Sequence, residues 1–202
     1  AIFGVEPIKS GTIKMFGKES IPKNEYDSIK KGMGFVTENR RETGFFHNFD
    51  IKQNISILPF IKSSKMKGIW GLVSDTKEKE YALKGKNQLN IKCASIDQNI
   101  TELSGGNQQK VIIGRWLLTA PEILLMDEPT RGIDVGAKFE IYQLMINLAE
   151  KEKGIIMISS EMPELLGVTD RILVMSNGRV AGIVNTSETS QEEILKLTAK
   201  YL

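Results

Sequence analysis

The segment EILLMDEP, residues 122–129, constrains the fold of this chain more than any other stretch. Its four consecutive apolar residues predict a strand buried on both faces, which is typical of parallel sheets. The stretches 107–119 and 135–154 have the apolar spacing of helices, and GIIMISSE (154–161) predicts another buried strand. Strands that alternate with helices indicate an α/β fold with a largely parallel sheet.

Shorter signals place the remaining elements. SGTIKMFGKES (10–20) alternates like a half-exposed strand, and NEYDSIKKG (24–32) predicts a short helix followed by a strand. Gly154 stands where the glycine after a helix is expected. Asn177-Gly178 between apolar runs predicts a hairpin, and Ser190 opens a closing helix with the spacing of a capping box.

Residues 39–105 differ from the rest, being polar and lysine-rich with short helical patterns, and they predict a helical lobe. The whole chain of 202 residues is 41% hydrophobic and 26% charged, which is ordinary for a globular protein. A net charge of +2 gives no general attraction to nucleic acid. The single cysteine, Cys93, fits a reducing compartment, and neither a transmembrane helix nor a signal peptide is visible.

Two acidic residues follow the buried strand. A parallel strand delivers the residues after it to the carboxyl edge of the sheet, where ligands of α/β proteins bind. There Asp127 could hold Mg²⁺, and Glu128 could orient or deprotonate an attacking water. The alternative, that the pair only marks a strand leaving the core, is equally probable for an isolated motif.

The motif LSGGNQQK (103–110) predicts the N-terminus of a helix that is suited to bind an anion. Gly105 and Gly106 allow close approach of a ligand, and Ser104 can cap the helix and donate its hydroxyl to a phosphate. Free N–H groups and the helix dipole add to this. Taken alone, such a motif is more often a structural helix cap than a ligand-binding site.

Together, these motifs resemble the ATP-binding-cassette (ABC) ATPases. LSGGNQQK resembles their signature motif, and ILLMDEPTRGID (123–134) resembles their Walker B motif and D-loop. GFVTENRRETG (34–44) is similar to the Q-loop, and ISSEMPELLGVTDRILVMSNGRV (158–180) to the switch region and final strands. The sequences of these motifs are most similar to the second cassette of tandem sugar-importer ATPases. Within that group they resemble the galactoside type first and the ribose type next.

Three positions depart from the family pattern. No Walker A loop is present: Lys9 lies in GVEPIKSG (4–11), which lacks the second glycine and precedes a strand. The Q-loop glutamine is replaced by Glu38, and the switch histidine by Ser160. The lone His47 is interpreted as a loop or packing residue. We therefore expect the loop and the first strands of the sheet to precede this chain, and hydrolysis at its own site to be impaired.

The resemblance implies a P-loop NTPase-like fold in which one partial domain covers residues 1–202. Its α/β core would comprise 1–38 and 107–202, and its helical lobe, 39–106, would carry the Q-loop and the signature. The resemblance also implies ATP and Mg²⁺ as cofactors, with Asp127 and Glu38 near the metal. The nucleotide-contacting residues would be Ser104, Gly105, Gly106, Asn107, Gln108, Glu38, Asp134 and Ser160.

In that family, the signature of one cassette contacts ATP held by the other, and Asp134 would lie at the interface between cassettes. Expected partners are the N-terminal cassette or a second copy, membrane permease subunits, and, indirectly, a periplasmic sugar-binding protein. The permease would contact a groove of the lobe, in FHNFDIKQNI (46–55) and around Trp70. The location would be the cytoplasmic face of the bacterial inner membrane.

Other functional classes stay open. The missing loop, Glu38 and Ser160 also fit a non-hydrolysing module that regulates or scaffolds a membrane complex. A soluble ABC ATPase of DNA repair or translation is disfavoured. The lobe has no long coiled-coil insertion, and the net charge of +2 gives no sign of a nucleic-acid-binding surface.

Overall fold

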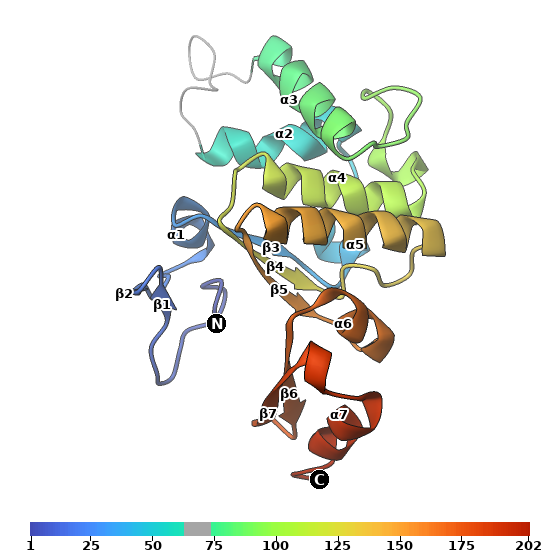
Figure 1. Ribbon diagram of the computed structural model, residues 1–202. Coiled ribbons are helices and arrows are strands. Elements are labelled where there is room, and N and C mark those ends of the chain that lie inside the picture. Colours follow the sequence, from blue (N-terminus) through green and yellow to red (C-terminus); the bar gives the residue numbers. More distant parts are fainter. Residues whose placement is uncertain (63–73) are drawn as a thin grey trace. The chain divides into compact units, whose positions relative to one another are not determined.

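Strand β4 (Ile123–Asp127) is the middle strand of a parallel sheet in the computed structural model, which describes residues 1–62 and 74–202 (Figure 1). It pairs with β3 (Met33–Val36) on one side and β5 (Gly154–Ile158) on the other. The expected α/β fold with a parallel sheet is thus confirmed. The described chain divides into two compact units, Ala1–Ile158 and Ser159–Leu202, each considered by itself below.

Two helices of the first unit follow from apolar periodicity. Helix α4 (Gly105–Leu117) buries most of its residues and contacts β3, while α5 (Val135–Glu150) contacts α4 and β5. In α5, Ile141 and Met145 are buried, and this pair belongs to the expected apolar stripe. Both helices were predicted with nearly these bounds.

The end of α5 differs from expectation. Gly154 is the first residue of β5, and the left-handed residue after the helix is Glu152, with φ of 61°. The helix therefore stops without a glycine cap. Strand β5 also alternates between exposed and half-buried residues, so the expectation of a buried strand is wrong. Ile156 and Ile158, on one face of this strand, are about half exposed.

The N-terminal segment forms a hairpin instead of one strand. β1 (Lys14–Met15) and β2 (Lys18–Glu19) pair antiparallel around Phe16 and Gly17, which both have positive φ. The alternation of polar and apolar residues across 10–20 hid this turn. Helix α1 (Glu25–Lys30) follows as predicted, capped by the side chain of Asn24.

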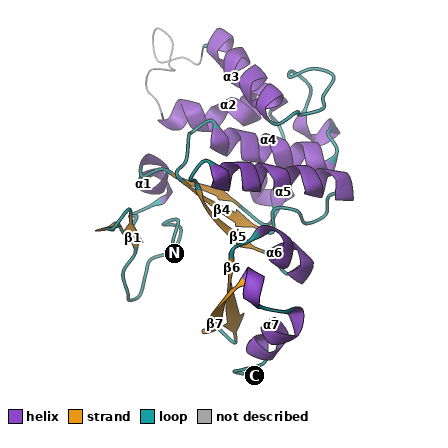
Figure 2. Ribbon diagram, in the orientation of Figure 1, coloured by secondary structure: helices purple, strands orange, loops and turns teal. Residues whose placement is uncertain are grey.

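The predicted helical lobe contains α2 (Ile51–Lys62) and α3 (Asp75–Gln88), preceded by a π-helical turn, η1 (Arg40–Gly44). A 3₁₀ turn, η4 (Ile100–Glu102), comes before the signature. Figure 2 shows α2 and α3 beside α4, and both contact it. The lobe boundaries stay a prediction, and Trp70 lies outside the described residues. No helix among those residues is both long enough and apolar enough to cross a membrane.

The second unit has its own small core. α6 (Met162–Val168) precedes the hairpin of β6 (Arg171–Ser176) and β7 (Arg179–Asn185), and η5 (Thr186–Glu188) leads to α7 (Gln191–Thr198). Positive φ angles at Asn177 and Gly178 confirm the predicted turn. The buried side chains at the centre of the unit are Ile172, Val174, Ala181 and Ile194.

Candidate functional site

The signature segment starts helix α4, with Ser104 in the N-cap position. Its hydroxyl does not cap the helix, contrary to expectation, and instead accepts a hydrogen bond from Asn107 Nδ2 at 3.0 Å. Among the described residues the Ser104 hydroxyl has no hydrogen-bond acceptor, so its proton could be donated to a ligand. The first N–H groups of a helix have no partner within it, so they add donors at the same place.

Asn107 and Gln108 make contacts within the fold. Asn107 Oδ1 accepts the backbone N–H of Lys92 at 2.8 Å, and Gln108 Nε2 donates to the carbonyl of Ile100 at 3.3 Å. Gln108 is buried. These bonds fix the loop before the helix, and the nucleotide contacts expected of the two residues stay predictions.

The two signature glycines are packed closely. A Cβ on Gly106 would lie 2.3 Å from Ala137 Cβ at the start of α5. A Cβ on Gly105 would lie 3.0 Å from Nη2 of Arg40 and 3.3 Å from the carbonyl oxygen of Gly132. Real Cβ atoms do not approach other atoms at 2.3 Å, so Gly106 is required for packing. Its expected contact with a ligand stays a prediction. The sequence contained no local signal for these neighbours.

Acidic side chains gather at the carboxyl edge of the sheet. Asp127 ends β4, and Glu128 follows with φ of 45° and donates its N–H to the carbonyl of Ile158 at 2.9 Å. Burial raises the pKa of Asp127, and the charges of Glu38 and Glu128 raise it further. The structure thus brings Glu38, Asp127 and Glu128 together, as the resemblance to the Q-loop and Walker B motif implies.

Glu38 has a cationic partner that sequence reasoning missed. Its carboxylate forms an ion pair with Arg131, from the loop after β4. Within the described ranges, no group of three or more His, Cys, Asp or Glu side chains is arranged to hold a metal ion. Asp127 and Glu38 could therefore contribute only part of a Mg²⁺ coordination shell, with the remaining ligands supplied by phosphate or water.

Asp134 is the N-cap of α5. Its Oδ1 accepts the backbone N–H of Ala137 at 2.9 Å, while the residue itself is exposed. An aspartate at this place stabilises the start of the helix. This contact gives Asp134 a structural role, and its expected place between two cassettes stays a prediction.

Ser160 belongs to the second unit, where it precedes α6. The neighbouring Ser159 hydroxyl donates to Glu164 Oε2 at 3.0 Å and accepts the N–H of Glu161 at the same distance. A network of this kind shapes the segment that carries Ser160. The role of Ser160 at a nucleotide stays a prediction.

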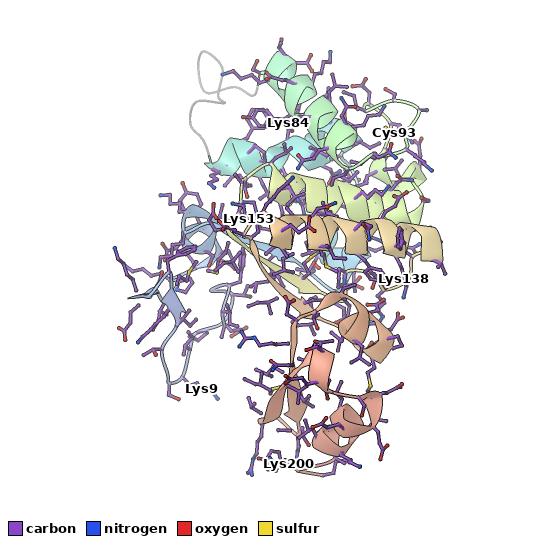
Figure 3. All side chains as sticks on the ribbon, in the orientation of Figure 1. Lys9, Lys84, Cys93, Lys138, Lys153 and Lys200 are labelled. Carbon is purple, nitrogen blue, oxygen red and sulfur yellow. The ribbon has the colours of Figure 1, made fainter. Side chains whose placement is uncertain are left out.

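Two other candidates are placed as expected. Lys9 lies in the irregular N-terminal stretch before β1, visible in Figure 3, and no helix starts beside it. His47 is exposed in a loop, with its ring 4.7 Å from that of Phe45 and its Nε2 against the carbonyl of Arg41. That neither residue binds phosphate or acts in catalysis stays a prediction.

Known proteins share both the sequence and the fold. The chain is 62% identical over 203 residues to the galactose/methyl galactoside import ATP-binding protein MglA of Pasteurella multocida, and 55% identical over 201 residues to that of Vibrio cholerae. Each alignment covers 100% of this chain and 39% of the relative. The chain therefore spans well under half the length of these relatives.

Solved structures of ATP-binding cassettes have the same fold. One is a dimeric cassette in a post-hydrolysis state with ADP and Pi, at TM-score 0.74 and 22% identity, covering 92% of this chain and 77% of that one. Another is a nucleotide-free cassette, at TM-score 0.76 and 22% identity, covering 98% and 77%. The family model described as "ABC transporter" matches residues 1–131. With this match and the shared fold, the chain belongs to the ABC transporter family, as an ATP-binding cassette domain.

Proposed function

We propose that this chain is the C-terminal cassette of a tandem ATPase that drives monosaccharide import, of the galactose/methyl galactoside type. The observation that carries the proposal is the identity of 62% to such an import protein over the whole of this chain. The alignment covers 39% of that relative, which leaves room in it for another cassette. ATP hydrolysis coupled to transport is the activity of the complete protein.

In this proposal the signature acts on ATP bound by the other cassette. Ser104 offers a hydroxyl that is not used to cap α4, and Gly105 and Gly106 belong to the helix start, where free N–H groups favour phosphate. These groups would stabilise negative charge on the terminal phosphate during its transfer. The cassette thus completes a site whose other half lies on its partner.

The acidic edge belongs to the cassette's own site. There Asp127 and Glu38 would face Mg²⁺, whose charge neutralises phosphate oxygens, and Glu128 would orient the attacking water. Arg131 offsets the charge of Glu38. Because glutamate and serine replace the usual glutamine and histidine, we propose that hydrolysis at this site is weak or absent.

The same proposal assigns partners and location. Permease subunits would contact the helical lobe, and a periplasmic sugar-binding protein would act through them. The ATPase would therefore lie at the cytoplasmic face of the inner membrane. This assignment rests on the import proteins that the chain resembles.

Two variants of the complete ATPase test which of the two ATP sites supports turnover, the one completed by the signature or the one at the acidic edge. Ser104→Arg places a bulky side chain at the signature and is expected to lower transport-coupled turnover on the order of a hundredfold. Glu128→Gln, at the proposed weak site, is expected to lower turnover far less. Turnover is measured with the permease in proteoliposomes, and similar losses in both variants would contradict the assignment.

The isolated chain provides an independent measurement. Without the other half of either site, residues 1–202 are expected to show no appreciable Mg²⁺-dependent ATP hydrolysis. Sustained phosphate release by the purified chain would contradict the proposal that each ATP site needs residues of both cassettes. A complete ATPase in which Ser104→Arg has no effect would instead favour a regulatory module.

A further inference from the structure

A guanidinium lies beside the first residue of the signature helix. Nη2 of Arg40 is 3.0 Å from the position that a Cβ of Gly105 would occupy. Arg40 is the first residue of η1, whose cap Asn39 accepts the N–H of Glu42 at 3.3 Å. A segment distant in sequence therefore brings a cation to the start of α4.

Within the described part of the chain, Arg40 has no countercharge. Its Nε is buried without a hydrogen-bond partner, and its side chain forms no ion pair with any residue that the structure describes. Glu38, two positions away, is instead paired with Arg131. Burial lowers the pKa of the Arg40 guanidinium, and the charge of Arg41 lowers it further. Arginine stays protonated despite this, so burying the unpaired cation costs free energy. A bound anion would reduce that cost.

We infer that Arg40 is a further phosphate-contacting residue of the signature, and that its guanidinium binds the terminal phosphate of ATP held by the partner cassette. The inference rests on the proposed function of the signature. Ser104 and the N–H groups of α4 offer only dipoles, whereas Arg40 adds a full positive charge. A planar guanidinium also matches two phosphate oxygens at once.

Equilibrium binding to the complete ATPase tests the inference. The probes are the non-hydrolysable β,γ-imido analogue of ATP and ADP, each with Mg²⁺. Arg40→Gln is expected to weaken binding of the analogue by about tenfold to a hundredfold, the loss of a charge-assisted hydrogen bond. ADP binding is expected to change by less than about twofold, because ADP lacks the γ-phosphate that Arg40 would contact.

The matched control is Arg41→Gln. It removes the same charge from the adjacent residue, which is exposed, and is expected to leave the affinity for both nucleotides unchanged. If Arg40→Gln behaves like this control, or weakens ADP as much as the analogue, the inference is overturned. Should Arg40→Gln fail to fold, Arg40→Lys replaces it, with weaker analogue binding and unchanged ADP binding expected from loss of the planar fork.

Ser104→Arg separates this inference from the proposed function. If Ser104→Arg abolishes turnover while Arg40→Gln binds the analogue normally, only the role of Arg40 is wrong. If Ser104→Arg leaves turnover unchanged, the proposed function itself fails. Both variants are measured in the same complete protein, so the two failures are distinguishable.

Discussion

At the scale of single residues, the signature glycines allow two close contacts between segments. Gly106 sits where any side chain would overlap the Cβ of Ala137, and Gly105 sits under the guanidinium of Arg40. A glycine in a helix costs about 1 kcal/mol relative to alanine, so its presence indicates a stronger constraint. Here the constraint is the close approach of α4 to the start of α5 and to the Arg40 segment.

Gly106→Ala is therefore expected to destabilise the first unit by about 1–3 kcal/mol, although alanine favours helices, because the new methyl group overpacks against Ala137. Ala137→Gly makes room, so the double variant should recover much of the loss. Urea unfolding of the four proteins in this cycle measures the coupling. Gly167→Ala is the control, because a Cβ there meets nothing within 4 Å. Additive effects of the two substitutions would contradict the close contact.

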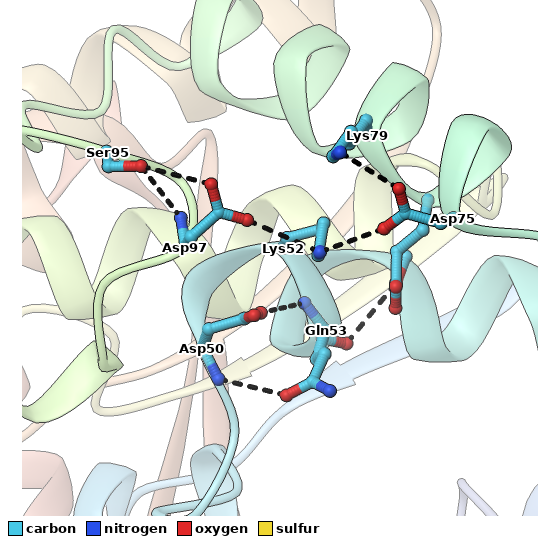
Figure 4. A network of polar contacts seen from close by, with 9 residues as sticks. Asp50, Lys52, Gln53, Asp75, Lys79, Ser95 and Asp97 are labelled. Atoms are coloured by element: carbon cyan, nitrogen blue, oxygen red, sulfur yellow. Dashed lines mark hydrogen bonds and ion pairs between the residues drawn. The ribbon is translucent and has the colours of Figure 1, made fainter.

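At the scale of elements, the helical lobe is held by a polar network around Lys52, seen in Figure 4. The side chain of Lys52 is only 12% exposed, and its Nζ lies 3.1 Å from Asp75 of α3 and 3.3 Å from Asp97 of the following loop. Asp50 and Gln53 exchange hydrogen bonds at the start of α2, as in a capping box. The network ties two helices and a loop together at their termini.

This network is expected to weaken in acid. Hydrogen bonds from Lys79 and then Lys52 hold the pKa of Asp75 below its usual value. The stability that Asp75 contributes is therefore present above about pH 4 and lost as the pH falls through its folded-state pKa. Unfolding of wild type and Asp75→Asn, followed from about pH 6 to pH 3, should converge as the pH falls.

Glu80→Gln is the control for that experiment. Glu80 is exposed on the same helix and forms no ion pair with the described residues. The difference between wild type and this variant should stay small at every pH, because an exposed charge contributes little. A difference for Asp75→Asn that persists undiminished at the lowest pH would show that the ion pairs do not stabilise the lobe.

At the scale of the whole chain, the two units have separate cores. Ile172 belongs to the core of residues 159–202, so Ile172→Ala is expected to destabilise this unit by about 2–4 kcal/mol. Leu173→Ala is the control on the same strand, since Leu173 is 52% exposed. Hydrogen exchange should accelerate within β6, β7 and α7 for Ile172→Ala alone. Equal acceleration in β3 and β4 would show that the units unfold together.

The sequence alone predicted several elements correctly. The apolar run before Asp127 predicted the central strand, the spacing within 135–150 predicted α5, and Asn177-Gly178 predicted the hairpin turn. These signals are local, because burial on one face repeats along a helix or strand with a fixed period. The gathering of Glu38 with Asp127 was implied by the resemblance to the Q-loop and Walker B motif.

Contacts between distant segments came only from the folded chain. The pairing of Glu38 with Arg131, the place of Arg40 over Gly105, and the contact of Gly106 with Ala137 join residues on different elements. The turn at Phe16-Gly17 was likewise hidden by an alternation that suits either a strand or a hairpin. Side-chain partners of this kind depend on how the helices and loops pack against one another, and no periodicity in the sequence records that packing.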